Sequence, residues 1–137
     1  MARKILVVDD ERHIVQQERV ALEGADYEVV IAYDGVEALE QVKSEMPDMI
    51  ILDIMMPRKD GFEVMRDLRA DPATANIPVI ILTAKAQDAD IYRGWQSGIS
   101  SYLTKPFNSR ELLTSVERIF RSLDEDPAGV GSEAWEV

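Results

Sequence analysis

Five polar side chains of this sequence stand at or just after the ends of short apolar segments. They are Asp9, Asp10, Asp53, Thr83 and Lys105. Carboxylates and hydroxyls are ligands of hard cations, and a lysine ammonium pairs with anionic oxygens. The sequence has no cysteine and a single histidine, which excludes thiolate chemistry and any site that needs two imidazoles. The chemistry left to these residues is that of oxygen ligands and hard cations.

Each of these residues, taken alone, has an ordinary structural explanation. An aspartate between a strand and a helix most often caps the helix, and a lone lysine is most often a solvated surface residue. One aspartate is enough for a cap, however, and here Asp9 and Asp10 are adjacent while Asp53 follows a different segment. Crowded carboxylates repel one another and would be protonated unless a cation neutralised them. The group therefore predicts a Mg²⁺ site, since this ion is held by one or two carboxylates and several waters.

A site of this kind suits phosphoryl transfer, which depends on charge neutralisation and positioning. A carboxylate can act as the nucleophile and form an acyl phosphate. On this hypothesis Lys105 pairs with one phosphoryl oxygen, and the hydroxyl of Thr83 donates a hydrogen bond to another.

The apolar segments before these residues have the pattern of buried parallel strands. Five segments occur, over 5–8, 29–32, 49–52, 79–82 and 102–103. The third and fourth do not alternate with polar residues, which is typical of strands buried on both faces. Stretches with helical spacing separate the segments, and this alternation predicts an α/β fold with a doubly wound, five-stranded parallel sheet. Ligands of such sheets bind at the carboxyl ends of the strands, so the five polar side chains are expected to converge there.

Helical periodicity is clear in the last predicted helix and irregular in the first. The last helix carries an apolar stripe that ends at Leu123, and Asn108 with Glu111 resembles a capping box at its start. In the first helix, Gln17 and Glu18 occupy positions where the stripe favours apolar side chains. The pattern alone gives no physical reason for these two residues.

Length and charge limit the architecture and the partners of this 137-residue sequence. We expect a folded domain over 1–123 and a flexible acidic tail over 124–137, because the periodicity stops there. A formal net charge of −11 opposes direct binding to nucleic acid. No apolar stretch near the N-terminus is long enough for a secretion signal or a membrane span, so a cytoplasmic location without membrane insertion is expected.

Four motifs follow one another in an order and spacing that carry a family resemblance. They are VVDDE at 7–11, LDIMMP at 52–57 with Asp60-Gly61, ILTA at 81–84 and YLTKPF at 102–107. Together they resemble the successive signatures of bacterial two-component response-regulator receiver domains of the CheY-like type. The resemblance covers about residues 3 to 123.

The resemblance implies a role for each motif residue and a flavodoxin-like strand order of 2-1-3-4-5. Asp53 is then the phosphoacceptor, and Lys105 is the lysine that pairs with the phosphoryl group. Mg²⁺ is held by Asp9, Asp10, Asp53 and the backbone carbonyl of Met55. Thr83 and Tyr102 are then the switch residues, and the Lys105-Pro106 peptide bond is cis.

The resemblance also implies partners. A sensor histidine kinase or a phosphotransfer protein donates the phosphoryl group, and a downstream protein binds the face made by the fourth helix, the fifth strand and the fifth helix. Tyr92 and Trp95 belong to that face or pack partly into the core. Trp135 is a docking element of the tail or simply part of a free tail. The expected protein is a single-domain regulator that catalyses only its own phosphorylation and dephosphorylation, and a fragment of a longer regulator is the alternative.

Three other functions fit the sequence less well. A magnesium phosphatase of the haloacid-dehalogenase type also forms an aspartyl phosphate. That class carries an Asp-x-Asp motif, however, and in this sequence Met55 stands at the position of the second acid. A degenerate receiver that acts only as a scaffold is disfavoured because all five key residues are present. A flavin-binding electron carrier is disfavoured because no phosphate-binding loop rich in Ser, Thr and Gly follows the first strand.

Overall fold

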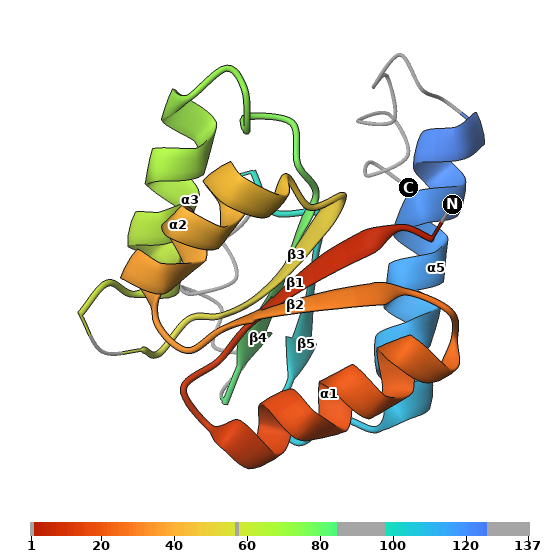
Figure 1. Ribbon diagram of the computed structural model, residues 1–137. Coiled ribbons are helices and arrows are strands. Elements are labelled where there is room, and N and C mark those ends of the chain that lie inside the picture. The colour runs from red at the N-terminus through yellow and green to blue at the C-terminus, as the bar shows by residue number, and fades with distance from the viewer. Residues whose placement is uncertain (1, 57, 85–97, 126–137) are drawn as a thin grey trace.

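A single parallel sheet forms the centre of the computed structural model, which describes residues 2–56, 58–84 and 98–125. Its strands lie in the order β2-β1-β3-β4-β5 (Figure 1). Their bounds are β1 Lys4–Val8, β2 Glu28–Ala32, β3 Met49–Asp53, β4 Val79–Thr83 and β5 Ser101–Thr104. The predicted α/β fold, its doubly wound parallel sheet and its strand order are confirmed. Each strand extends one residue beyond its apolar segment at one end or both, because pairing with the neighbouring strand does not require an apolar side chain.

Helices cover both faces of the sheet. Those that the structure describes are α1 Arg12–Gly24, α2 Gly35–Glu45, α3 Gly61–Ala70 and α5 Ser109–Glu125. Figure 1 shows α1 and α5 on one face and α2 and α3 on the other. The predicted fourth helix, with Tyr92 and Trp95, and residues 126–137 of the predicted tail, with Trp135, lie outside the described residues. The first two residues of that predicted tail, Asp124 and Glu125, belong to α5. None of the helices in the described ranges is both long and apolar enough to cross a membrane.

The side chains of each strand alternate between these two helical layers. In β1, Ile5 and Val7 pack with α1 and α5, whereas Leu6 and Val8 pack with α2 and α3. All five residues of β3 and all five of β4 are buried. This two-sided burial explains why the two segments are continuously apolar. The alternation also determines which helical layer a residue faces when it continues the extended backbone just beyond a strand.

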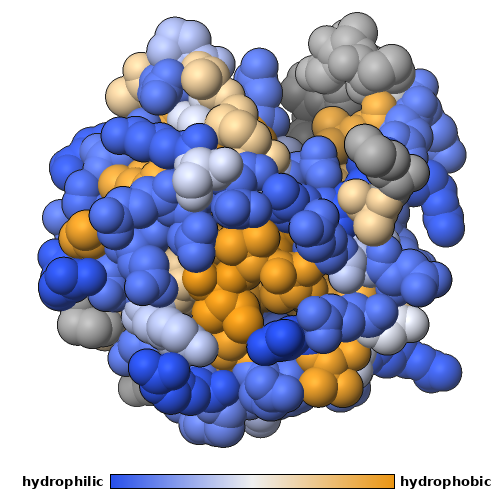
Figure 2. Space-filling view, in the orientation of Figure 1, coloured by the Kyte–Doolittle hydropathy of each residue, from blue (hydrophilic) through white to orange (hydrophobic). Residues whose placement is uncertain are grey.

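The edge strand β2 is less covered than the strands beside it. Figure 2 shows an apolar area at the centre of the face on which Figure 1 places β2, between α1 and α2. The strand residues Val29, Val30 and Ile31 are half-buried. Their position at the edge explains the difference, since β2 pairs only with β1 among the described strands.

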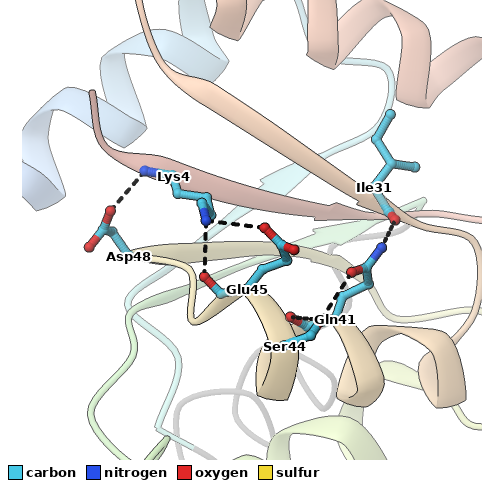
Figure 3. A network of polar contacts seen from close by, with 6 residues as sticks. All are labelled: Lys4, Ile31, Gln41, Ser44, Glu45 and Asp48. Atoms are coloured by element: carbon cyan, nitrogen blue, oxygen red, sulfur yellow. Dashed lines mark hydrogen bonds and ion pairs between the residues drawn. The ribbon is translucent and has the colours of Figure 1, made fainter. Parts of the chain in front are cut away.

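Local hydrogen bonds set where the helices begin and how α2 is attached. Asp34 caps α2 by accepting from the Glu37 N–H, and Asp60 with Glu63 forms a reciprocal capping box at α3. The Asn108 side chain accepts from the Glu111 N–H at 2.8 Å, as its sequence spacing predicted. A further set of contacts ties the C-terminal part of α2 to the sheet (Figure 3). These are Lys4 Nζ to Glu45 Oε1 at 3.1 Å, the Lys4 N–H to Asp48 Oδ2 at 2.7 Å, and Gln41 Nε2 to the Ile31 carbonyl at 3.2 Å.

We expect Gly61→Ala to destabilise the fold, because the start of α3 lies directly against the end of β3. A Cβ at Gly61 would stand 2.8 Å from the Asp53 carbonyl oxygen and 2.8 Å from the Ile54 Cα, and both are backbone atoms that cannot move aside cheaply. The expected loss is about 2 kcal/mol of unfolding free energy, measured by urea denaturation. Gly24→Ala is the matched control, since a Cβ there meets nothing within 4 Å. Equal stabilities for the two variants would contradict the prediction.

Candidate functional site

The carboxyl ends of four strands lie at one level of the sheet. Val8 of β1 is paired with Leu52 of β3, and Asp53 is paired with Leu82 of β4. Thr83 of β4 is paired with Thr104 of β5, which places Lys105 just beyond the same edge. The predicted convergence of the five polar residues therefore follows from the register of the strands.

Asp9, Asp10 and Asp53 form a compact group of carboxylates. One ligand atom from each lies within 4.8 Å of those of the other two, with Asp9 and Asp53 buried and Asp10 exposed. Helix capping does not account for them. The N-cap of α1 is Glu11, which makes no side-chain cap hydrogen bond, and α3 is capped by Asp60. Asp9 instead accepts a hydrogen bond from the Glu11 N–H at 3.0 Å.

The ammonium of Lys105 lies inside this group. Its Nζ is 2.8 Å from Asp9 Oδ2 and 3.5 Å from Asp53 Oδ2, and it is 3.2 Å from Glu11 Oε1 on the solvent side. The Lys105 side chain is only 12% exposed. The residue is placed by its backbone, because its N–H donates to the Thr83 carbonyl at 2.7 Å and the Lys105-Pro106 peptide bond is cis, as predicted.

The charges of the pocket do not balance. Burial and the carboxylate of Asp9 raise the pKa of Asp53 to about 7, although Lys105 and a hydrogen bond from the Met55 N–H oppose the shift. Burial disfavours the charged form of Lys105, but its contacts with Asp9 and Asp53 outweigh that cost and raise its pKa. Among the described residues, Lys105 is the one ammonium paired with Asp9 and Asp53, which leaves an excess of negative charge in this part of the structure. A divalent cation would remove that excess, so the residues present fit one.

Thr83, Tyr102 and Met55 are the remaining residues that the resemblance assigns to the site. Thr83 is buried at the end of β4, and the half-buried Tyr102 packs against the core on the α2 and α3 side of the sheet. The Met55 N–H donates to Asp53 Oδ1 at 3.3 Å, and its side chain is 72% exposed. The roles of these three residues in metal binding and switching stay predictions.

Sequence reasoning missed two acidic residues near the pocket. Glu11 pairs with Lys105, although it entered the sequence argument only as part of a motif. Glu18 is fully buried in α1, whereas its neighbour Gln17 is exposed. The signal for Glu18 was its place on an otherwise apolar stripe, which shows that the residue is unusual but does not show what it faces.

Comparison with known proteins gives a family for this geometry. Residues 5–117 match the family described as the response regulator receiver domain. The chain belongs to this family. Among curated relatives of the receiver domain, the alkaline phosphatase synthesis transcriptional regulatory protein PhoP of Bacillus subtilis (strain 168) is 44% identical over 121 residues, which are 88% of this chain and 50% of PhoP. The DNA-binding response regulator MtrA of Mycobacterium tuberculosis (strain H37Rv) is 37% identical over 128 residues, which are 93% of this chain and 55% of MtrA.

Solved receiver structures share the fold. The chemotaxis response regulator CheY4 of Vibrio cholerae matches with a TM-score of 0.83 and 34% identity, over 87% of this chain and 99% of that one. The receiver domain of the Francisella response regulator 1452 matches with a TM-score of 0.80 and 36% identity, over 87% and 97% of the two chains. This chain spans about half the length of the curated relatives it matches and almost all of these two receiver structures.

We expect Asp53→Asn to stabilise the receiver domain when divalent cations are absent. The folded-state pKa of Asp53 is about 7, above its ordinary value of 3.8, so the folded state keeps a proton that the unfolded state has released. Stability therefore falls as pH rises between these values, and the penalty is complete above the folded pKa. Replacing the acid should raise the unfolding free energy at pH 8 by on the order of 2 kcal/mol and flatten its pH dependence.

Urea denaturation in EDTA between pH 4 and pH 8 measures this effect. The control is Asp71→Asn, which changes an exposed aspartate at the end of α3. Saturating Mg²⁺ should narrow the gap between parent and Asp53→Asn. Identical pH profiles in EDTA would show that Asp53 does not carry the unbalanced charge.

Proposed function

We propose that this receiver domain accepts a phosphoryl group on Asp53 from a sensor histidine kinase or a phosphotransfer protein, and signals by a change in protein binding. The observation that supports it best is the placement of Asp53, a buried carboxylate beside two other acids and within 3.5 Å of a lysine ammonium. In the proposed site Asp9, Asp10, Asp53 and the Met55 carbonyl hold Mg²⁺. Bound there, the ion would supply positive charge to phosphoryl oxygens and keep the aspartates ionised.

In the proposed reaction a carboxylate oxygen of Asp53 attacks phosphorus. The new O–P bond forms as the bond between phosphorus and the donor nitrogen breaks, and the electron pair of that bond leaves with the donor imidazole. Lys105 pairs with one phosphoryl oxygen, and the Thr83 hydroxyl donates to another. The protein contributes charge and position, and its folding in advance of the reaction reduces the reorganisation required.

The proposed switch uses the link between β4 and β5. Ile81 and Tyr102 are paired across these strands, and Thr83 accepts a backbone hydrogen bond from Lys105. A phosphoryl group adds almost two negative charges and strong acceptor oxygens near the end of β4. Movement of Thr83 toward it would give Tyr102 space to change rotamer. The surface of the fourth helix, β5 and α5 is the proposed output face, which a downstream protein would bind.

The output of the full protein is a separate proposal. PhoP and MtrA are named as a transcriptional regulator and a DNA-binding regulator, and both are about twice as long as the part matched. We propose that this receiver acts on another protein and does not itself contact DNA, because its net charge is −11. We also propose that the folded domain ends with α5, and that the rest of the predicted 124–137 segment is a separate acidic tail.

Incubation with acetyl phosphate and Mg²⁺ tests the central proposal. The intact mass of the parent should increase by one phosphoryl group, and Asp53→Asn should show no increase because it lacks the nucleophile. Asp71→Asn should react like the parent. A mass gain that survives in Asp53→Asn would place the modification elsewhere, and no gain in any variant would contradict phosphorylation by small donors.

Replacing Lys105 should separate metal binding from phosphoryl transfer. We expect Lys105→Met to slow phosphorylation by roughly a hundredfold, because one phosphoryl oxygen loses its charge partner in a buried site. Mg²⁺ affinity, measured by calorimetry, should hold or rise, since an ammonium that competes for Asp9 and Asp53 has been removed. Lys4→Met is the control, because it also removes a lysine but at the end of β1 that lies away from the site. A matching loss of Mg²⁺ affinity would assign Lys105 to the support of the metal site.

A further inference from the structure

Glu18 is the buried acid that the proposed mechanism does not use. Its side chain has no exposed surface, and neither carboxyl oxygen has a hydrogen-bond partner among the residues that the structure describes. An unpartnered carboxyl in a protein interior is less favourable than an apolar side chain of similar size. An apolar side chain would suit this position, because the other buried residues of α1 are Val15 and Leu22.

The geometry of the sheet shows what Glu18 faces. Ile5 and Val7 of β1, like Met49 and Ile51 of β3, point to the layer of α1 and α5. Asp9 and Asp53 continue these two alternating series, so they face the same layer. Val15 and Leu22 pack in that layer, and Glu18 lies between them on the same stripe of α1.

Two further observations bring Glu18 within electrostatic range of Lys105. The neighbouring Gln17 donates from Nε2 to the Phe107 carbonyl at 3.3 Å, which fixes this turn of α1 against the loop that carries Lys105. Burial, with the charges of Asp9 and Asp53, raises the pKa of Glu18, while the charge of Lys105 opposes that shift. The carboxyl group therefore lies within electrostatic reach of both partners of the ammonium.

A cation in the aspartate pocket would compete with Lys105. The ammonium lies 2.8 Å from Asp9 and 3.5 Å from Asp53, and both are proposed ligands. A divalent ion would share their oxygens and repel the ammonium. Glu11, whose Oε1 is 3.2 Å from the ammonium, would draw it toward solvent, whereas the buried Glu18 would keep it inside the protein.

We propose that Glu18 is a positioning residue for Lys105: its carboxyl oxygen accepts the ammonium when a divalent cation occupies Asp9 and Asp53. This inference rests on the proposed phosphorylation site. It explains why two polar atoms stay unpartnered in a position that suits an apolar residue. It assigns Glu18 no contact with the cation or the phosphoryl group.

The first test compares Glu18→Leu with Glu18→Gln. In EDTA, Glu18→Leu should unfold at a higher urea concentration than the parent, because an unpartnered polar group is removed. Its Mg²⁺ dissociation constant, measured by calorimetry, should be weaker by roughly tenfold, because the ammonium then has no inner acceptor and stays on Asp9. Glu18→Gln keeps an acceptor oxygen and should stay within about threefold of the parent.

A double-mutant cycle shows whether Glu18 acts through Lys105. In a Lys105→Met background, Glu18→Leu should change the Mg²⁺ dissociation constant by less than about twofold. Val15→Ala is the matched packing control, and it should lower stability without a selective loss of Mg²⁺ affinity. Glu18→Met, which is unbranched and of similar length, replaces Glu18→Leu if the latter does not fold.

Three results would overturn the inference. They are a stabilised Glu18→Leu with parental Mg²⁺ affinity, a Glu18→Gln as weak as Glu18→Leu, and a full effect of Glu18→Leu without Lys105. Phosphorylation of the parent by acetyl phosphate is measured alongside. A parent that binds Mg²⁺ but takes no phosphoryl group would contradict the proposed function, while the binding cycle would still decide the role of Glu18.

Discussion

Mutual repulsion between carboxylates at the carboxyl edge of the sheet is the constraint on which the site depends. Asp9 and Asp53 are buried, and Asp10 adds a third charge within 4.8 Å. Lys105 reduces the repulsion but does not cancel it, since burial together with the charges of Asp9 and Asp10 still raises the pKa of Asp53 to about 7. The folded domain therefore holds a group of charges whose free energy falls when positive charge enters. Binding of a cation and folding are coupled through this term.

The sheet imposes this arrangement because its interior strands are too buried to carry polar side chains along their length. β3 and β4 are buried along their whole length, so polar side chains appear only where each strand ends. The parallel register then brings those ends together. The hydrogen bond from the Lys105 N–H to the Thr83 carbonyl brings the end of β5 to the same edge of the sheet. The proposed chemistry and the proposed switch would consequently both use neighbouring strand ends, so that a charge change at Asp53 would act on the β4–β5 link over a short distance.

Sequence patterns predicted the parts of the molecule that depend on periodicity and order. Continuous apolar segments identified β3 and β4, and the placement of Asp53 and Lys105 after strands predicted their convergence. The roles assigned to these residues came from the family resemblance, which also supplied the cis peptide bond. Details that depend on three-dimensional proximity were not predicted. The reciprocal cap of Asp60 and Glu63 has the same three-residue spacing as Asn108 and Glu111, so the sequence did carry a signal for it. The Glu11–Lys105 pair joins residues 94 positions apart, which no local pattern relates.

Glu18 shows where a pattern identifies an exception but cannot interpret it. The stripe of α1 shows that an acid replaces an apolar residue, and a sequence reading leaves open whether the helix turns that position outward. The fold removes this freedom, because Val15 and Leu22 on either side are buried against the sheet. The acid must then enter the layer that Asp9 and Asp53 also face. A buried acid in such a place lowers stability unless another state of the protein gives it a partner. The proposed competition between Lys105 and a cation for the same aspartates would supply such a state, so the cost without a cation and the proposed use with one would have a single physical origin.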